Sequence, residues 1–171
     1  MTSKLKTDIL ETVSGSGTIA LTNQLSGMTS ASVPSGSVLQ IVHASSSTNQ
    51  TTTSTSFVQY SSLTATITPT STSSKILISS TVEANIRLNG GSNMQTSVQI
   101  YRGGSAVSRL VQMRGYDYGN SGLYLVGHVP IEHLDTPSTT SAITYSIYYK
   151  NDAGTDTNIR NGSITLTEIK G

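Results

Sequence analysis

The chain has 171 residues, enough for one domain with its own hydrophobic core, and it contains no cysteine, so no disulfide stabilises it. Only 11% of the residues are charged, against roughly 25% in an average globular protein, and the formal net charge is +1. Without a clustered basic stripe or an apolar run of roughly 20 residues, the composition excludes nucleic-acid binding and membrane insertion.

Residues 1–37 predict a short N-terminal segment that differs from the rest of the chain. Apolar and polar residues alternate over residues 4–13, residues 14–17 (SGSG) predict a turn, and residues 18–22 begin a second short strand. A β-hairpin of this size is not stable alone, so it must pair with its own domain, with copies of itself or with another protein. Residues 25–36 are typical of a linker. The start of the chain lacks the apolar region of a secretory signal, so we expect folding in a cytoplasm.

From residue 38 onward the hydrophobic pattern has period two, which predicts β-strands. The clearest strand covers residues 75–88, where Leu77 is the only apolar residue on the polar face. The opposite face carries Ile76, Ile78, Ser80, Val82, Ala84, Ile86 and Leu88. A long strand with one polar face is typical of an antiparallel sheet that is half solvated.

Further alternating runs occupy residues 63–68, 98–101, 123–131, 143–149 and 164–166. Glycine and asparagine residues lie between these runs. They predict turns, because Gly and Asn tolerate the positive φ angles of tight hairpins. The predicted turns lie at residues 89–91, 103–104, 152–154 and 161–162, and at Pro69 and Pro137. We expect Tyr145 and Tyr149 to lie in the core or against a neighbouring subunit. No helix is predicted, and about eight strands over residues 38–171 indicate an all-β fold, an antiparallel two-sheet jelly-roll sandwich.

Several stretches resemble virion proteins of marine tailed bacteriophages. Residues 3–11 (SKLKTDILE) and 15–19 (GSGTI) resemble the N-termini of many small virion proteins of these phages. The starts of phage fibre and tail head domains are similar to residues 53–58 (TSTSFV), 63–69 (LTATITP) and 73–78 (SSKILI). The last strand of those heads is similar to residues 162–169 (GSITLTEI).

The resemblance implies a homotrimer with a jelly-roll head, similar in shape to the complement and tumour-necrosis-factor-like folds. It also implies that residues 1–37 attach to other virion proteins. The residues expected to make that attachment are Leu5, Ile9, Leu10, Val13, Ile19 and Leu21. It implies no catalytic residue.

These features together favour a bacteriophage virion structural protein, made in the host cytoplasm and located in the virion. We expect a tail-associated fibre or adaptor whose trimeric head contacts a protein or a host surface. A capsid head fibre or decoration protein and a free carbohydrate-binding module remain alternatives. We do not expect an enzyme, because no serine lies in a Gly-x-Ser-x-Gly elbow and no pair of carboxylates can be nominated.

Residues 116–124 (YDYGNSGLY) form the most distinctive local segment, with tyrosines around an aspartate and glycines. Aromatic residues on adaptable loops are common in protein interfaces, and they also stack on sugar rings. We therefore expect a subunit contact or a receptor contact, with a plain loop as the third possibility. The residues expected to contribute are Tyr116, Asp117, Tyr118, Asn120 and Tyr124.

A metal site is not expected, and neither is a cofactor. The best oxygen-ligand set is Asp152, Asp156 and Asn158, on a predicted hairpin tip where hard-cation ligands could converge. Their spacing does not match an ordered Ca²⁺ loop, so a polar hairpin tip is the simpler interpretation.

Overall fold

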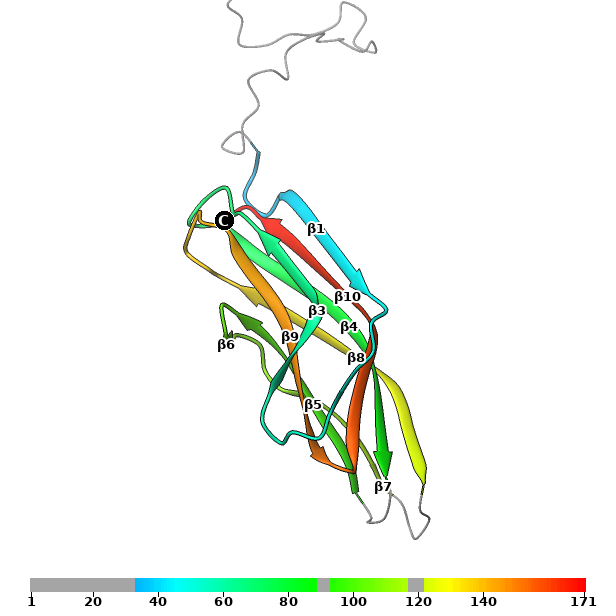
Figure 1. The fold of residues 1–171 in the computed structure, drawn as a ribbon. Helices are drawn as coiled ribbons and strands as arrows, with labels where there is room; N and C mark the ends of the chain where they lie inside the picture. The colour runs from blue at the N-terminus through cyan, green and yellow to red at the C-terminus, as the bar shows by residue number, and fades with distance from the viewer. Residues whose placement is uncertain (1–32, 89–92, 117–121) are drawn as a thin grey trace, which may run out of the picture. The chain divides into compact units, whose positions relative to one another are not determined.

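The computed structural model describes residues 33–88, 93–116 and 122–171 (Figure 1). The predicted N-terminal hairpin at residues 4–22 and the predicted turn at residues 89–91 lie outside these ranges. The chain divides into two units, Met1–Val33 and Pro34–Gly171, and the second unit contains all the described strands. No helix in the described part of the chain is long and apolar enough to cross a membrane.

The described residues form strands and no helix, which confirms the all-β prediction. The strands are β1 (Val38–Ser46), β2 (Gln50–Thr52), β3 (Val58–Ile67), β4 (Lys75–Leu88), β5 (Asn93–Arg102), β6 (Ser105–Ala106), β7 (Val111–Tyr116), β8 (Leu123–Asp135), β9 (Ile143–Ala153) and β10 (Asp156–Ile169).

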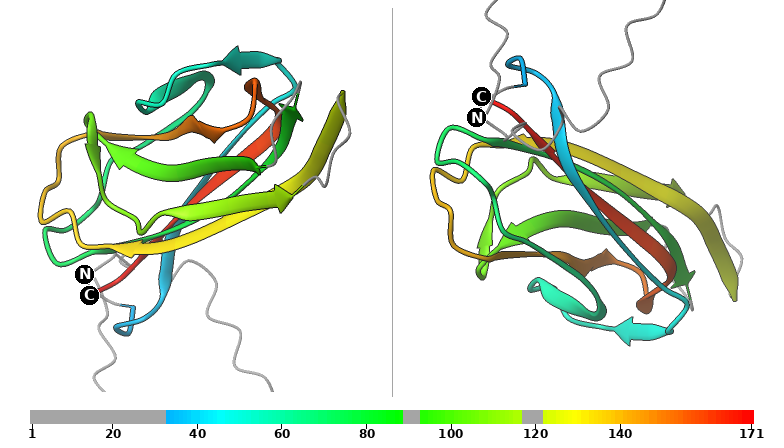
Figure 2. Two further views of the ribbon diagram at one scale, coloured as in Figure 1. Left: turned by 90° about the horizontal axis from the view of Figure 1, so that it is seen from below. Right: turned by 90° about the horizontal axis from the view of Figure 1, so that it is seen from above.

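The strands build two antiparallel sheets that pack face to face as a sandwich (Figures 1 and 2). Sheet A has the order β1-β10-β4-β8, with β2 also paired to β10, and sheet B has the order β3-β9-β5-β6, with β7 also paired to β5. The chain passes between the sheets at the connections β2–β3, β3–β4, β4–β5, β7–β8, β8–β9 and β9–β10. The predicted two-sheet jelly-roll sandwich is therefore confirmed.

The core lies between the sheets, where the period-two pattern places the apolar side chains. Along β4 the predicted inward residues are buried in strict alternation, and the prediction for this strand is confirmed. Sheet B contributes Tyr145 and Tyr149, which are fully buried, so their predicted core position is also confirmed. Tyr149 Oη donates to the carbonyl oxygen of Gln50 at 2.8 Å, and burial raises the pKa of Tyr149 to about 12.

The predicted turn at residues 161–162 is wrong, because these residues lie inside β10. The register with β4 shifts between Arg160 and Ser163, which marks a β-bulge, and Asn161 has a φ of 47°. This bulge uses the positive φ that tight hairpin turns also use, so the local sequence does not distinguish the two. A Cβ at Gly162 would lie 2.7 Å from Leu63 Cδ2, so the bulge also needs glycine for close packing.

The predicted turns at residues 103–104 and at Pro69 and Pro137 lie between strands, whereas the turn predicted at residues 152–154 is displaced toward β10. Gly103 and Gly104, with φ of 55° and 87°, connect β5 to β6. In the β9–β10 hairpin the turn is formed by Gly154 and Thr155, and Asp152 and Ala153 still belong to β9. This hairpin lies at the end of the sandwich opposite the start of β1 (Figure 1).

Candidate binding surface

The outer face of sheet A exposes large side chains from its edge strand β8. Tyr124 is 65% exposed, Val126 55% and Leu134 49%. Strand pairing aligns β1, β10, β4 and β8, so outward residues on the four strands form rows across the sheet. These rows divide the face into an apolar end, a central region of small hydroxyl residues and a polar end.

The apolar end is one row of four residues, which we call the apolar row. Ile41 on β1 lies opposite Thr167 on β10, Thr167 lies opposite Leu77 on β4, and Leu77 lies opposite Leu134 on β8. Ile41 is 63% exposed. The row lies near the start of β1, where Gly36 N donates to the carbonyl oxygen of Lys170 at 2.8 Å.

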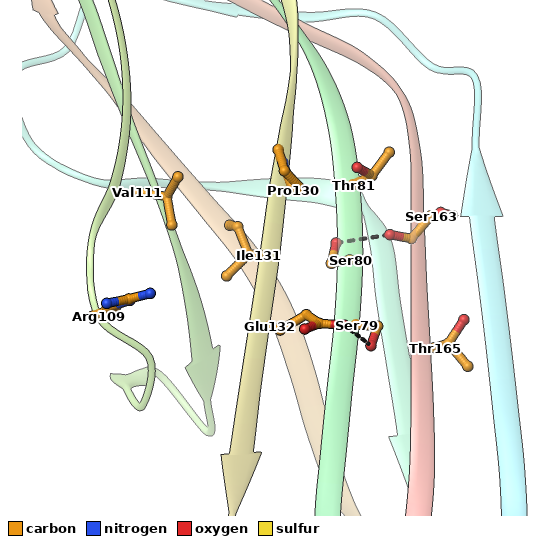
Figure 3. Close-up of a pocket in the computed structure, with 10 residues that line it drawn as sticks. All are labelled: Ser79, Ser80, Thr81, Arg109, Val111, Pro130, Ile131, Glu132, Ser163 and Thr165. Carbon is orange, nitrogen blue, oxygen red and sulfur yellow. Dashed lines mark hydrogen bonds between the residues drawn. The ribbon is translucent and has the colours of Figure 1, made fainter.

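Beside the central region lies a hollow lined by residues of β4, β8 and β10 together with Arg109 and Val111, which come from the sheet B side (Figure 3). Ser79 Oγ donates to Glu132 Oε1 at 3.2 Å, and Ser80 Oγ donates to the carbonyl oxygen of Ser163 at 2.7 Å. Arg109 lies beyond β8, away from the other lining residues of β4 and β10. The ten lining residues include no histidine, and the carboxylate of Glu132 is the acidic group among them.

The polar end forms a second hollow of about 520 Å³, which we call the polar hollow. It lies between β2, β4, β8 and β10, at the end of the sheet away from the apolar row. The lining residues are Asn49, Thr51, Asn85, Arg87, Tyr124, Val126, Asp156, Asn158 and Arg160. One aromatic ring thus adjoins two guanidinium groups, a carboxylate and three amides.

Ion pairs and hydrogen bonds hold the polar side chains of the hollow in place. Arg87 Nη2 pairs with Asp156 Oδ2, and Asn158 Nδ2 donates to Thr51 Oγ1 at 2.7 Å. Arg160 pairs with Glu83, the neighbouring outward residue of β4, through Nε and Nη2, each at 2.7 Å from Oε1.

Hydrogen bonds also keep the carboxylate of Glu83, beside the hollow, in its charged form. Asn161 Nδ2 donates to Glu83 Oε2 at 2.9 Å. Together with the bond from Arg160, it lowers the pKa of Glu83 below the ordinary 4.5, so the carboxylate stays ionised at neutral pH.

One acceptor at the hollow is unsatisfied. Asn85 Oδ1 is buried and has no hydrogen-bond partner among the described residues.

The predicted contact residues are placed only in part. Tyr116 at the end of β7 is 71% exposed, and Tyr124 near the start of β8 contributes to the polar hollow. The predicted contacts Asp117, Tyr118 and Asn120 lie outside the described residues. So do the six predicted attachment residues, Leu5, Ile9, Leu10, Val13, Ile19 and Leu21.

The three candidate ion ligands have separate partners. Asp152 pairs with Lys150 at 2.7 Å and accepts from Ser97, both on sheet B. Asp156 pairs with Arg87 and Asn158 bonds to Thr51, both on sheet A. Within the described ranges, no three His, Cys, Asp or Glu side chains come together in a group that could hold a metal ion.

Sequence reasoning missed the convergence on the polar hollow. In the sequence, Tyr124 indicates a contact residue, and Asp156 and Asn158 indicate possible ion ligands. The sequence does not indicate such a role for Asn85 or Arg87, which come from the polar face of β4. The alternation along β4 indicates that both side chains point outward. Only the pairing of β4 with β8 and β10, however, shows that these two residues lie beside the other three.

Comparison with known proteins shows no family whose profile matches the chain and no similar curated protein. Among solved structures, the chain is similar to the structure of infectious bursal disease virus Gx strain, with 14% identity and a TM-score of 0.45 over 80% of this chain and 34% of that one. It is also similar to the T13 viral particle of infectious bursal disease virus, with 15% identity and a TM-score of 0.42 over 77% and 31%.

A third similar structure is a mutant VP2 protein of the same virus in T=1 particles, at 16% identity and a TM-score of 0.41 over 91% and 36% of the two chains. The chain thus spans about a third of the length of each of these solved structures. Similarity at these TM-scores carries no argument about function, so the proposals below rest on the sequence and on the geometry of sheet A.

Proposed function

We propose that this chain is a structural protein of a bacteriophage particle, a tail-associated fibre or adaptor that acts by binding and without catalysis. Residues 1–37 dock on other virion proteins, and residues 38–171 form a homotrimeric head that contacts a protein or a host surface. The virion assignment is supported by the resemblance of residues 3–19 and 162–169 to phage virion proteins. The binding role is supported by the outer face of sheet A.

The apolar row is the observation that carries the binding role. Ile41 and Leu134 are 63% and 49% exposed at opposite edges of a sheet face that otherwise presents mostly small hydroxyl and charged side chains. Burying a side chain of this size stabilises by about 1.5–3 kcal/mol relative to leaving it exposed, so an uncovered row favours association. We assign the row to contact between head copies.

The position of the row agrees with this assignment. Gly36 and Ser37 pair through their backbones with Lys170, at 2.8 and 2.9 Å, so the chain enters the head beside the row. Copies whose N-terminal segments dock together on one particle hold this end of each head close to its neighbours. The effective concentration of the apolar rows is then high, which favours their contact.

The attachment role is tested by deleting residues 1–24 and measuring incorporation into particles. The truncated chain should keep the melting temperature of the full chain, since the described strands begin at Val38, but it should be missing from purified particles. Incorporation of the truncated chain at the normal level would refute the anchor assignment.

The trimer contact is tested by native mass spectrometry of the full chain and of residues 34–171. Both should be trimers, and the double variant Ile41→Ser, Leu134→Ser should be a monomer. Val126→Ser is the matched control, because Val126 is equally exposed on β8 but lies outside the row. A monomeric parent protein, or a trimer that survives the double substitution, contradicts the assignment.

A further inference from the structure

We infer that the polar hollow binds a neutral saccharide. The inference rests on the proposed host-surface contact and names the chemical class of its ligand. It concerns the end of sheet A away from the apolar row, so the head can associate through one end and keep the other open.

An exposed aromatic ring beside fixed polar groups is the arrangement that a sugar requires. A pyranose ring presents an apolar face of C–H groups, which packs on an aromatic ring, and a rim of hydroxyl groups, which need donors and acceptors. Tyr124 is 65% exposed, and its register partner across the sheet is Arg87, which pairs with Asp156. One row of the sheet therefore supplies both the stacking surface and the polar groups.

The polar groups are held in place before a ligand arrives. The Arg87–Asp156 pair fixes the guanidinium through one terminal nitrogen, so its other N–H groups can donate to a ligand. The amide of Asn158 is fixed in the same way by its bond to Thr51, and its oxygen remains as an acceptor. Fixed side chains lose less conformational entropy on binding, which favours a small ligand in a shallow site.

Asn85 gives an independent indication of a ligand. Its Oδ1 is buried at the hollow without a partner among the described residues, although an unsatisfied buried acceptor is costly. Such groups are rare in folded proteins and require an explanation. This oxygen has almost no exposed surface, so it can accept from a ligand hydroxyl group only after the Asn85 side chain turns toward the hollow.

The charges indicate that the saccharide is neutral. Arg87 is matched by Asp156, and Arg160 by Glu83, so neither guanidinium is available as an unpaired cation for a carboxylate or sulfate. An anionic ligand has to compete with these carboxylates at close range. Hydroxyl groups can bond to the remaining N–H groups without disturbing the pairs.

The test is a saturation-transfer NMR titration of the purified full-length protein with two sets of methyl glycosides. The neutral set contains glucose, galactose, mannose, fucose and N-acetylglucosamine glycosides, and the anionic set contains glucuronic and sialic acid glycosides. We expect at least one neutral glycoside to bind with its ring C–H protons saturated. Absence of binding by every neutral glycoside at millimolar concentration, or binding of the anionic set alone, overturns the inference.

Two variants locate the binding. Tyr124→Ala should weaken the affinity about tenfold through loss of the stacking surface. Leu110→Ala is the control, because Leu110 is 41% exposed but does not line the hollow, and it should bind as the parent does. Equal losses in the two variants, or no loss in Tyr124→Ala, contradict the assignment.

Asn85→Leu separates a ligand contact from a structural role. If Oδ1 serves a ligand, the variant loses saccharide affinity while its melting temperature stays equal or rises, since a buried unsatisfied acceptor is removed. Lowered stability with unchanged affinity overturns the role of Asn85. Incorporation into particles is scored separately, so failure to bind saccharides with normal incorporation refutes this inference and leaves the proposed virion role intact.

Discussion

Replacement of Glu168 tests the packing account most severely, because this carboxylate is fully buried at the end of β10. Its Oε1 accepts from the backbone N and Oγ1 of Thr70 at 2.7 and 2.8 Å and from Ser74 Oγ at 2.6 Å. Its Oε2 accepts from Gln40 Nε2 at 2.6 Å. Glu168 thereby ties the β3–β4 connection and β1 to β10.

The Glu168→Gln variant keeps the shape of the side chain and removes its charge. Hydrogen bonds to a charged group contribute about 1.5–3 kcal/mol and neutral ones about 0.5–1.5 kcal/mol. Three bonds to the retained oxygen become neutral, and the new amide group meets the donor of Gln40. We therefore expect the free energy of unfolding to fall by about 3 kcal/mol at pH 7.

The pH dependence of the unfolding free energy gives a second expectation, whose direction follows from the pKa of Glu168. Burial opposes ionisation of Glu168, but the bonds from Ser74, Gln40 and Thr70 outweigh it and lower its pKa below the ordinary 4.5. The unfolded chain therefore takes up this proton first, and the stability contributed by the ionised group is present above pH 4.5 and is lost as the pH falls through the folded-state pKa. The difference in unfolding free energy between the parent and Glu168→Gln should therefore decrease as the pH is lowered.

Urea unfolding of the parent and Glu168→Gln at pH 7 and at several values below 4.5 measures both effects. Glu132→Gln serves as the control, because Glu132 is exposed, and its unfolding free energy should change by no more than about 0.5 kcal/mol. Equal stability of Glu168→Gln and the parent at pH 7, or a gap that stays constant with pH, would refute the reasoning.

Three further substitutions or titrations probe the core. Gly162→Ala should lower the unfolding free energy by about 1–3 kcal/mol in urea, because its Cβ would overlap Leu63. Tyr145→Phe removes the bond from Tyr145 Oη to Asp135 Oδ2 at 2.7 Å and should cost about 1–2 kcal/mol by thermal unfolding. Burial raises the pKa of Tyr149 from 10.0 to about 12, so stability should fall between pH 10 and 12, and Tyr149→Phe should flatten that slope.

The sequence predicts the sandwich well where one face of a strand meets the core and the other meets water. β4 is the best case, because every inward position is apolar or small and the outward positions are almost all polar. Edge strand β1 gives a weaker signal, since its inward residues include Gln40 and its outward residues include Ile41. Burial is partial at a sheet edge, so the alternation that identifies a strand is diluted there.

The candidate surface was harder to predict, because it depends on register between distant strands. Ile41, Leu77 and Leu134 are ordinary strand residues in the sequence, and only pairing with β10 and β4 brings them into one row. The buried position of Glu168, by contrast, could have been predicted from the local sequence. The alternation that turns Ile164 and Leu166 inward also turns Glu168 inward, and an inward carboxylate requires hydrogen-bond donors.

A cryo-electron microscopy map of the intact particle tests the central claim most directly. It shows where the head lies and which end of the outer face of sheet A is covered. The account predicts three heads in contact through the row of Ile41, Leu77 and Leu134, with the polar hollow open to solvent. Absence of the chain from the particle, or heads whose apolar rows are all exposed, would contradict it.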